Sequence, residues 1–345
     1  MHMRSLRLIV ALALALPSLA AAATGSRQLI DASGLKWFIN TDITFSTSSS
    51  ASGAMSEASY THAVMATTSG GGVVSSTLND AFDGYNALCV SLTGATGPCA
   101  TGNPSYTIYN KNGVATTECV GPTSGVNRQV VLGLQTIGAI QVQRKLFIPD
   151  NDAFARWLNI FTNTSGAPVT VTMITSNNLG SDSNTRIDST SDGDTTAELT
   201  DTWVTTFQNY SGTTSSDPRL GHVLQGPGAP VGLAAINFVN GDDNPFWAYT
   251  FTLAAGQTRI IMNFATGQPS RAAARAQAAA LVALPGTALQ CMTSDEKSMV
   301  LNFQPSGPGP VPVPTLGPWA LALLVLLTAG CGVMALQRQM PGHLR

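Results

Sequence analysis

A run of eighteen residues without a charged side chain, residues 319–336, most constrains what this chain can fold into. A helix of that length can cross the roughly 30 Å hydrocarbon core of a bilayer, so the run predicts a single C-terminal transmembrane helix. Trp319 begins the run and Arg338 follows it, an order that places the tryptophan at the outer interface and the arginine on the cytoplasmic side. A buried core helix is the alternative interpretation, and a proline-rich stretch directly before the run argues against it.

That proline-rich stretch occupies residues 305–314 and reads PSGPGPVPVP. Proline has no backbone N–H and keeps the chain extended, so we expect a spacer between a folded domain and the tail. The predicted organisation is a domain at residues 24–304, the spacer at residues 305–314 and a tail at residues 315–345.

The N-terminus has the order of a secretory signal peptide. Arg4 and Arg7 precede a short apolar run at residues 8–16, and small alanines follow at residues 20–23. We therefore expect residues 1–23 to be removed on export. A permanent N-terminal anchor is the alternative, but the apolar run is too short for a stable membrane-spanning helix.

The residues that join the spacer to the apolar run resemble the IPTL-CTERM sorting signal of Gram-negative bacteria. That signal reads Ile-Pro-Thr-Leu, two variable residues and Trp-Gly, and an apolar helix and basic residues follow it. The corresponding residues here are Val313, Pro314, Thr315, Leu316 and Trp319. Val313 stands where the signal has isoleucine, Ala320 stands where it has glycine, and Arg338 stands alone in place of a basic cluster.

This resemblance implies an address for the protein rather than a chemistry for its domain. Tails of this layout are similar to PEP-CTERM tails, which membrane-embedded exosortases process for surface display, often in bacteria that make extracellular polysaccharide. The resemblance therefore implies a membrane and an exosortase-type enzyme as partners, and extracellular polysaccharide as a further partner. It also implies that the domain lies outside the cytoplasm, anchored in the membrane or displayed on the cell surface.

The central part of the chain is typical of β-structure. Only 10% of all residues are charged, whereas Thr, Ser, Asn, Gly and Ala are abundant, which suits short strands joined by polar turns. At residues 169–174 and 249–253, apolar side chains alternate with polar ones, the period of a half-buried antiparallel strand. We expect a mainly β fold, an antiparallel β-sandwich with one or two short helices near its C-terminal end.

Two turns are expected to join neighbouring strands as hairpins. Residues 254–257 read AAGQ and lie between predicted strands at residues 249–253 and 259–264, and their glycine suits a tight turn. Residues 163–168 read NTSGAP and are expected to connect the strands on either side in the same way. Consecutive hairpins of this kind build a sandwich.

Two helices are predicted after these strands. Ser270 is a good N-cap for an alanine-rich run at residues 271–284, which Pro285 closes. Thr293 and Glu296 have the spacing of a capping box, which predicts a second, short helix. We expect both helices to pack on an end or a face of the sheets.

The charge distribution and the cysteines indicate the compartment and exclude one class of partner. Every Asp and Glu lies between Asp31 and Glu296, so the domain is acidic and nucleic-acid binding is disfavoured. An even number of cysteines in an exported domain predicts disulfide bonds. The four cysteines allow three connectivities, which the sequence leaves open. They are Cys89, Cys99, Cys119 and Cys291.

Two acidic loops are the best candidates for a metal ligand, and calcium is the metal that flexible loops of hard oxygen donors favour. The first loop also contains Glu198, and the second also contains Asn240 and Asn244. The candidate ligands are Asp182, Asp188, Asp192, Asp194, Asp242 and Asp243. The alternative is that these residues form turns that bond to their own backbone.

The motifs of common hydrolases and nucleotide-binding enzymes are missing from the sequence. A Ser/His/Asp arrangement would have to use His62 or His222, and a structural histidine is the favoured interpretation of His222. Asp150 and Asp152 could supply one carboxylate of a glycosidase, without a recognisable partner. Four aromatic residues are candidates for a sugar-stacking surface: Trp157, Trp203, Phe246 and Trp247. The alternative is that these aromatic side chains belong to the core.

The favoured hypothesis is therefore an exported surface protein without catalytic activity. The alternative is a surface-displayed carbohydrate-active enzyme or carbohydrate-binding module. The strand–turn–strand organisation of residues 147–174 supports that alternative, because it resembles carbohydrate-active supersandwich domains.

Overall fold

The described part of the chain is almost entirely antiparallel β-structure, as the sequence predicts. The computed structural model describes residues 26–41, 51–99, 102–111 and 114–304, all within one compact unit that extends from Met1 to Pro305. Within these ranges, no helix is long and apolar enough to cross a bilayer. The predicted signal peptide, spacer and tail lie outside the described residues.

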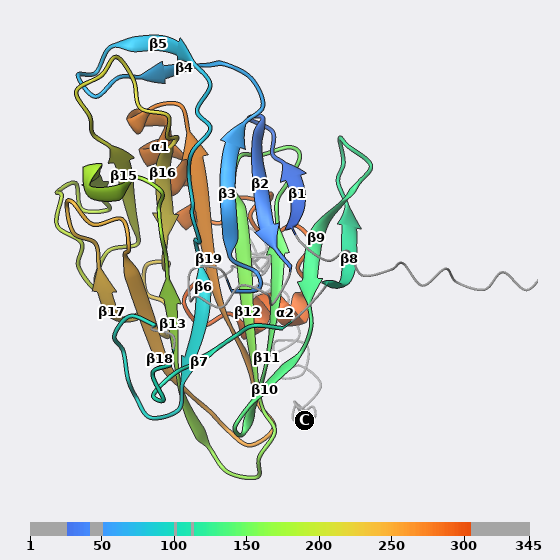
Figure 1. Ribbon diagram of the computed structural model, residues 1–345. Helices are drawn as coiled ribbons and strands as arrows, with labels where there is room; N and C mark the ends of the chain where they lie inside the picture. The colour runs from blue at the N-terminus through green and yellow to red at the C-terminus, as the bar shows by residue number, and fades with distance from the viewer. Residues whose placement is uncertain (1–25, 42–50, 100–101, 112–113, 305–345) are drawn as a thin grey trace, which may run out of the picture. The chain divides into compact units, whose positions relative to one another are not determined.

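The largest sheet has nine strands (Figure 1). They are β8 (Val114–Val120), β9 (Asn127–Leu132), β10 (Gln135–Ile137), β11 (Ile140–Phe147), β12 (Ala155–Asn163), β14 (Thr185–Thr190), β15 (Trp203–Gln208), β16 (Arg219–Val223) and β19 (Thr258–Gln268). Their order is β14-β15-β16-β19-β12-β11-β9-β8, and β10 pairs with β11. Within this sheet, β8 pairs only with β9, so it is an edge strand.

Three smaller sheets complete the β-structure. Five strands pair in the order β17-β18-β13-β6-β7, three in the order β1-β2-β3, and two form a separate ribbon, β4-β5. Their bounds are β1 (Ser26–Ile30), β2 (Leu35–Asn40), β3 (Met55–Tyr60), β4 (Val64–Thr67), β5 (Val73–Ser76), β6 (Ala87–Ser91), β7 (Thr107–Ile108), β13 (Val169–Ser176), β17 (Leu233–Asn237) and β18 (Phe246–Leu253).

The main core lies where the five-stranded and three-stranded sheets face the nine-stranded one. Trp37 of β2, Trp157 of β12 and Trp247 of β18 are fully buried in it. The ring of Tyr85 lies 5.7 Å from that of Trp157 and 6.0 Å from that of Trp247. Side chains from all three sheets therefore share one apolar layer, which is the defining feature of a β-sandwich.

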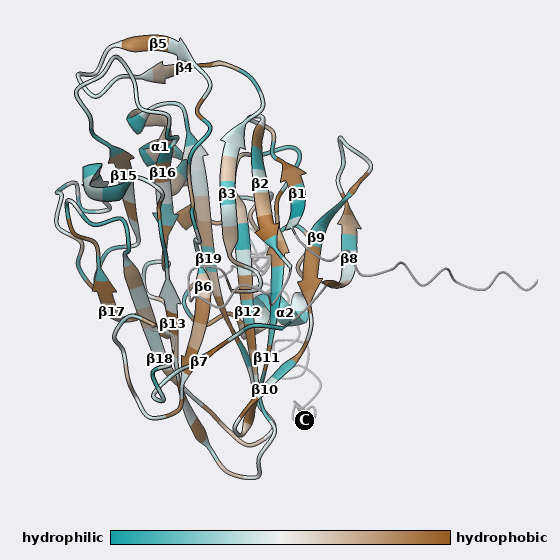
Figure 2. Ribbon diagram, viewed as in Figure 1, coloured by the Kyte–Doolittle hydropathy of each residue, from teal (hydrophilic) through white to brown (hydrophobic). Residues whose placement is uncertain are grey.

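The other face of the large sheet is also buried. Along β12, Trp157 faces the sandwich core, whereas Leu158 belongs to a second apolar cluster on the opposite face. Successive side chains of a strand point to opposite faces, so β12 contributes buried apolar residues to both clusters. Figure 2 shows hydrophobic and hydrophilic bands along the strands.

The predicted hairpins are wrong, although the strands themselves are confirmed. β18 pairs with β13 and β17, whereas β19 pairs with β12 and β16. Residues 254–257 therefore carry the chain from one sheet to the other, and residues 163–168 do the same between β12 and β13.

Asn163 shows why these two turns lie side by side. Its backbone N–H donates to Gln257 O at 2.9 Å, and its side-chain amide donates to Leu253 O at 3.1 Å and to Ala167 O at 2.7 Å. One buried asparagine thus satisfies backbone groups of both crossing turns. A single chain segment cannot specify this arrangement, because two of these three bonds reach residues about ninety positions away.

The two helices are confirmed, and both pack on the outer face of the nine-stranded sheet. Helix α1 (Arg271–Val282) begins where Ser270 accepts the N–H of Ala273, and helix α2 (Ser294–Met299) begins with the predicted capping box. Gly221 of β16 allows α1 to approach closely, because a Cβ atom there would lie 3.3 Å from the Cβ of Ala278.

Candidate functional site

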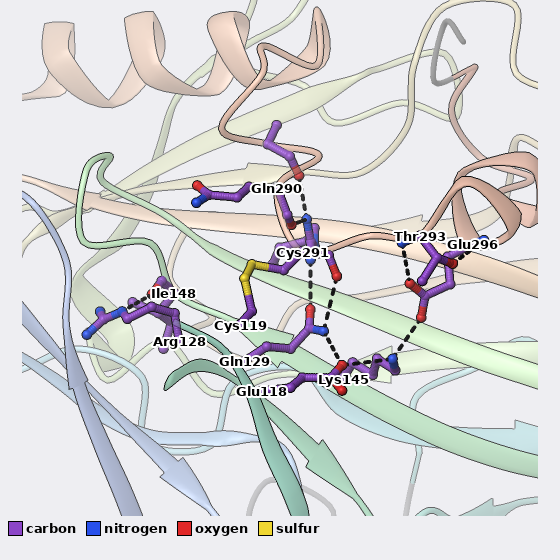
Figure 3. The surroundings of a disulfide bond; sticks show 12 residues. Glu118, Cys119, Arg128, Gln129, Lys145, Ile148, Gln290, Cys291, Thr293 and Glu296 are labelled. Carbon is purple, nitrogen blue, oxygen red and sulfur yellow. Dashed lines mark hydrogen bonds and ion pairs between the residues drawn. A yellow bond between two sulfur atoms is a disulfide. The ribbon is translucent and has the colours of Figure 1, made fainter. Parts of the chain in front are cut away.

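The C-terminal part of the described chain is the region that leads directly to the predicted tail. After α1 it passes over the outer face of the large sheet, forms α2, and reaches Gln304. Contacts with five different strands hold it there, and most of them are drawn in Figure 3.

A disulfide bond joins Cys119 of edge strand β8 to Cys291, just before α2 (Figure 3). Their Cα atoms lie 5.7 Å apart, and 172 positions separate them in sequence. Both residues have a left-handed backbone, with φ of 65° and 67°, a conformation that costs a non-glycine residue free energy. The covalent bond holds both backbones in place.

Buried Arg156 of β12 forms hydrogen bonds with the loop that precedes Cys291. One of its guanidinium nitrogens donates to Ala288 O and to Gln290 O, both at 2.7 Å, and the other donates to Gln129 Oε1 at 2.9 Å. Gln129 in turn donates to Cys291 O at 3.3 Å. Burial lowers the pKa of Arg156 to about 9, so the side chain stays charged at neutral pH.

Lys145 of β11 adds an ionic contact next to these hydrogen bonds. Its Nζ lies 2.9 Å from Glu118 of β8 and 2.9 Å from Glu296 of α2. Although burial opposes the charge, the hydrogen bonds that Lys145 donates to Glu296 and Glu118 raise its pKa. The lysine therefore links the sheet edge to the capping box of the last helix.

The final described residues add a short pairing alongside β19. Val300 forms a parallel bridge with Ile260, and the N–H of Leu301 donates to Ile260 O at 2.9 Å. Asn302 accepts the N–H of Met262 at 2.8 Å and donates to Leu224 O at 2.7 Å. The chain is thus fixed to the core within two residues of Gln304.

The second disulfide, between Cys89 and Cys99, lies far from this region in the fold. It links β6 to the loop that leads to β7, with Cα atoms 6.1 Å apart. It packs in a small apolar cluster with Ile174 and Ala248. The sequence predicts disulfides among these four cysteines, and the structure determines which of the three connectivities forms.

His222 lies in the sandwich core rather than at a surface. Its Nδ1 lies 2.8 Å from Tyr85 Oη and its Nε2 lies 3.0 Å from Thr206 Oγ1. Burial lowers its pKa to about 3, so the ring is neutral at physiological pH. The other histidine, His62, is exposed in a turn beside Thr61.

The predicted glycosidase carboxylates take part in local structure. Asp150 accepts the backbone N–H groups of Thr123 and Ser124. Asp152 accepts hydrogen bonds from Gln277 at 2.9 Å and Thr287 at 2.6 Å.

The predicted aromatic surface is mostly core. Trp157 and Trp247 are fully buried, and Trp203 and Phe246 are partly buried. Trp247 packs against Tyr85 and is stacked on Phe238, with ring centroids 5.9 Å apart. These side chains therefore stabilise the fold and offer no continuous platform to a sugar.

The structure brings the two predicted acidic loops into contact, and Asn240 also accepts the N–H of Ile187 at 2.8 Å. The N–H of Asp182 donates to Asp243 at 3.2 Å. The other candidates lie elsewhere: Asp188 pairs with Arg271 and Arg275 of α1, and Thr190 donates to Asp192 and Asp194 within one turn. Asp242 is exposed and accepts from Asn244 within its own loop.

One pocket of about 570 Å³ lies between the β4–β5 ribbon and the loop after β15. Most lining residues carry a hydroxyl or amide group, all are uncharged, and Tyr210 is 39% exposed. The lining residues are Thr68, Ser69, Gly70, Val74, Asn209, Tyr210, Ser211, Gly212 and Thr213. The sequence offered no signal for this pocket, because its two sides are about 140 residues apart.

Several solved structures are similar to this chain at low identity. A polysaccharide lyase is 12% identical, with a TM-score of 0.38. The similarity covers 75% of this chain, and this chain spans only 35% of the lyase. A galactose mutarotase-like protein from Lactobacillus casei is 10% identical with a TM-score of 0.35, covering 71% of this chain and 99% of that one. A galactose mutarotase related enzyme from Lactobacillus acidophilus is 9% identical, with a TM-score of 0.34. The similarity covers 70% of this chain and 97% of that enzyme.

A search of curated protein sequences finds no match. The IPTL-CTERM motif model matches residues 311–338, which include every residue of the signature recognised in the sequence. The folded β-sandwich of this chain therefore precedes a C-terminal IPTL-CTERM motif.

Proposed function

We propose that this chain is an exported, non-catalytic surface protein, whose β-sandwich is displayed outside the cytoplasm and sorted through its C-terminal tail. The IPTL-CTERM motif at residues 311–338 is the observation that carries the proposal. Such a motif acts as an address, so it supports secretion and sorting. The chemistry of the domain has to be argued from the domain itself.

Two features of the domain support an exported protein without catalytic activity. Its two disulfides suit an oxidising compartment, since thiols in the cytoplasm are kept reduced. The residues considered for catalysis are engaged elsewhere: His222 in the core, and Asp150 and Asp152 in turns and helix contacts. Both observations favour a stable displayed domain over an enzyme.

The C-terminal contacts suit a protein that is held by its tail. A force on the tail would be resisted by the pairing of residues 300–302 with β19. It is then met by the ionic contact of Lys145 with Glu296, and finally by the disulfide at Cys291. These contacts lie in series between the tail and the centre of the sheet, which protects the core from unravelling from its C-terminal end.

Processing by an exosortase-type enzyme is the finer part of the proposal. Pro314 restricts the preceding residue to an extended conformation, which keeps the signature accessible to an enzyme. Thr315, Leu316 and Trp319 would then be recognised, and the apolar helix would hold the substrate in the membrane until cleavage.

Mass spectrometry of the mature protein tests this proposal. The chain is expressed in a Gram-negative host that has an exosortase, and the C-terminal peptide is identified in the membrane and surface fractions. We expect the surface form to end before Trp319. Recovery of the intact peptide from Trp319 to Arg345 as the sole C-terminus would reject processing, although anchoring would stand.

Two variants make the test specific to the signature. Leu316→Ala combined with Trp319→Ala is expected to leave the tail uncut and to remove the protein from the surface fraction. Thr328→Ala lies in the same apolar run but outside the signature, and it should be processed like the unmodified chain. Equal processing of all three chains would contradict recognition of the signature.

The pocket between the β4–β5 ribbon and the loop after β15 favours a second candidate, carbohydrate binding. An uncharged lining rich in hydroxyl groups, with one exposed tyrosine ring, suits a neutral polyhydroxylated ligand. Retardation of the protein in gels that contain a neutral polysaccharide, extracted from the producing bacterium, would test this. Tyr210→Ala should abolish the retardation, and Tyr106→Ala, outside the pocket, should not.

A further inference from the structure

The peptide bond between Asp217 and Pro218 lies in a buried segment directly before β16. Both residues are buried, and Asp217 is only 3% exposed. Nowhere else in the sequence does an aspartate directly precede a proline. The side-chain carboxyl of such an aspartate can attack its own backbone carbonyl carbon, because the two groups close a small, unstrained ring, and the proline nitrogen can leave as an amine. The surroundings of the bond determine whether this attack is favoured.

One oxygen of the Asp217 carboxyl is available as a nucleophile. Ser216 donates a hydrogen bond to Oδ1 at 3.0 Å, whereas the buried Oδ2 has no partner among the residues that the structure describes. A buried carboxyl oxygen without a donor is rare in folded proteins, because it has lost its water without gaining a partner. The neighbouring arginine, Arg219, donates to the backbone carbonyl of Asp217 instead.

Two buried side chains polarise the backbone carbonyl that would be attacked. Arg219 Nη1 donates to Asp217 O at 2.6 Å, and Ser215 Oγ donates to the same oxygen at 3.4 Å. The other end of the guanidinium donates to Thr67 O, which fixes its orientation. A positive charge and hydrogen-bond donors aimed at a carbonyl oxygen stabilise the negative charge that develops there during attack, and the effect is larger away from water.

The proton that the leaving proline nitrogen needs is present on the Asp217 carboxyl at neutral pH. Burial is the main cause that raises the pKa of Asp217 to about 8; the charges of Asp80 and Asp182 add to it, whereas Ser216 and Arg219 act in the opposite direction. An ordinary aspartate, with a pKa of about 4, has lost this proton at neutral pH. The same carboxyl can therefore supply both the attacking oxygen and the proton.

We propose that the Asp217–Pro218 bond is a self-cleavage site of the displayed domain. Asp217 Oδ2 attacks the carbonyl carbon of its own residue, the C–N bond to Pro218 breaks, and the carboxyl proton passes to the proline nitrogen. The first fragment then ends in a cyclic anhydride, which one water molecule opens to two carboxyl groups. Ser216, beside the bond, is partly exposed, so water reaches the site from that side. The reaction modifies the chain itself and goes beyond the proposed sorting role.

Cleavage would divide the domain without separating its two parts. The first fragment ends at Asp217 and contains Cys119, whereas the second begins at Pro218 and contains Cys291, so the long-range disulfide joins them. Strand pairing joins them too, because β15 and β12 of the first fragment pair with β16 and β19 of the second. The fragment with the sorting motif would thus carry the larger fragment through one disulfide and a shared sheet.

Incubation of the freshly purified protein at pH 7, with protease inhibitors present, tests the proposal. Samples taken over several days are separated on reducing and non-reducing gels, and mass spectrometry identifies the fragments. We expect two fragments that separate only after reduction, the second with Pro218 as its first residue. Cleavage should slow as the pH rises above about 8, because the carboxyl then loses the proton that the proline nitrogen takes up.

The same protein unfolded in guanidinium is the control for the intrinsic lability of an aspartyl-prolyl bond. Unfolding removes the burial of Asp217 and its contact with Arg219, so the folded protein should be cleaved at least tenfold faster at pH 7. Equal rates in the folded and the unfolded protein would overturn the proposal, and so would a folded protein that yields no fragment beginning at Pro218.

Three variants locate the chemistry. Asp217→Ser removes the attacking carboxyl and should abolish cleavage. Pro218→Ala retains every polar group of the site but makes the leaving amine less basic, so it should slow cleavage at least tenfold, and it keeps the test valid if Asp217→Ser does not fold. Asp242→Ser changes an exposed aspartate that no proline follows, and it should be cleaved like the unmodified protein. Unchanged cleavage in a folded Asp217→Ser or Pro218→Ala protein would contradict the proposed attack.

Discussion

The two disulfides cross-link regions that are built in different ways. Cys89 and Cys99 are ten positions apart and close a short loop beside the five-stranded sheet. Cys119 and Cys291 are 172 positions apart and join the edge of the large sheet to the segment before the tail. The first bond fixes local structure, whereas the second closes most of the domain.

The surroundings of the two bonds differ in the same sense. Cys89 and Cys99 are buried among a few apolar side chains. Cys119 and Cys291 are only partly buried, and hydrogen bonds from Arg156 and Gln129 and an ionic contact of Lys145 surround them (Figure 3). The comparison indicates that polar contacts reinforce the disulfide at the end that leads to the sorting motif, whereas apolar packing surrounds the other disulfide.

The largest effect is expected from removing the long-range disulfide. In the chain-entropy account, closing a loop of 172 residues stabilises the folded state by about 5 kcal/mol. Cys119→Ser combined with Cys291→Ser should lower the free energy of unfolding by about that amount, measured by guanidinium denaturation. A loss of stability no larger than that caused by removing the short-range disulfide would contradict the proposed difference between the two bonds.

Removal of the buried arginine beside that disulfide should have the next largest effect. Arg156→Met leaves the carbonyls of Ala288 and Gln290 without donors, so we expect a loss of about 4 kcal/mol in the free energy of unfolding. Hydrogen exchange should show faster exchange at residues 285–293. Arg259→Met, near the crossing turns, is the control and should leave that segment protected.

Loss of the short-range disulfide is expected to cost less. Closing a loop of ten residues contributes about 3 kcal/mol in the same account. The double variant Cys89→Ser with Cys99→Ser should therefore unfold at a higher guanidinium concentration than the variant that lacks the long-range bond. Hydrogen exchange should increase around β7 and remain unchanged in α2.

Replacement of the lysine that contacts both glutamates should have a small, salt-dependent effect. Lys145→Met removes an ionic contact that is partly solvated, so we expect a loss of about 1 kcal/mol at low salt. The difference from the unmodified protein should shrink in 1 M sodium chloride. A difference independent of salt would mean that packing, not charge, is what the lysine contributes.

The smallest expected effect is a change in stability at acidic pH. Burial alone would raise the pKa of Glu118, but the hydrogen bonds from Lys145 and Gln129 outweigh it and lower the pKa below its usual 4.5. A lowered carboxyl pKa stabilises the folded state above pH 4.5, and this contribution is lost as the pH falls further. The stability of Glu118→Gln relative to the unmodified protein, measured by denaturation, should therefore be lowest at pH 7 and approach equality near pH 3.

Sequence patterns predicted the elements of this fold better than its topology. Both helix starts, at Ser270 and Thr293, follow from capping chemistry within four residues. The strands around Val169 and Tyr249 follow from alternation. The turn at residues 254–257 looked like a hairpin because a glycine turn between two strands has the same local signal whether the strands pair or enter different sheets.

The candidate sites divide in the same way. The sorting motif is a contiguous segment, so the sequence alone revealed it. The pocket beside Tyr210 gave no signal, because it combines residues from two separate segments. His222 showed only a polar sequence neighbourhood, although its actual neighbours, Tyr85 and Thr206, come from other segments of the chain.

By itself, the sequence determined the sorting motif, the β-rich class, the helix starts and the presence of cysteines able to pair, because each depends on residues close together in the chain. Only the tertiary structure decided that Cys119 pairs with Cys291 and that β18 and β19 enter different sheets. Only the tertiary structure, likewise, brought the two sides of the pocket beside Tyr210 together. The physical reason is that strand pairing and side-chain burial are set by contacts between distant segments, whose free energies no local pattern records.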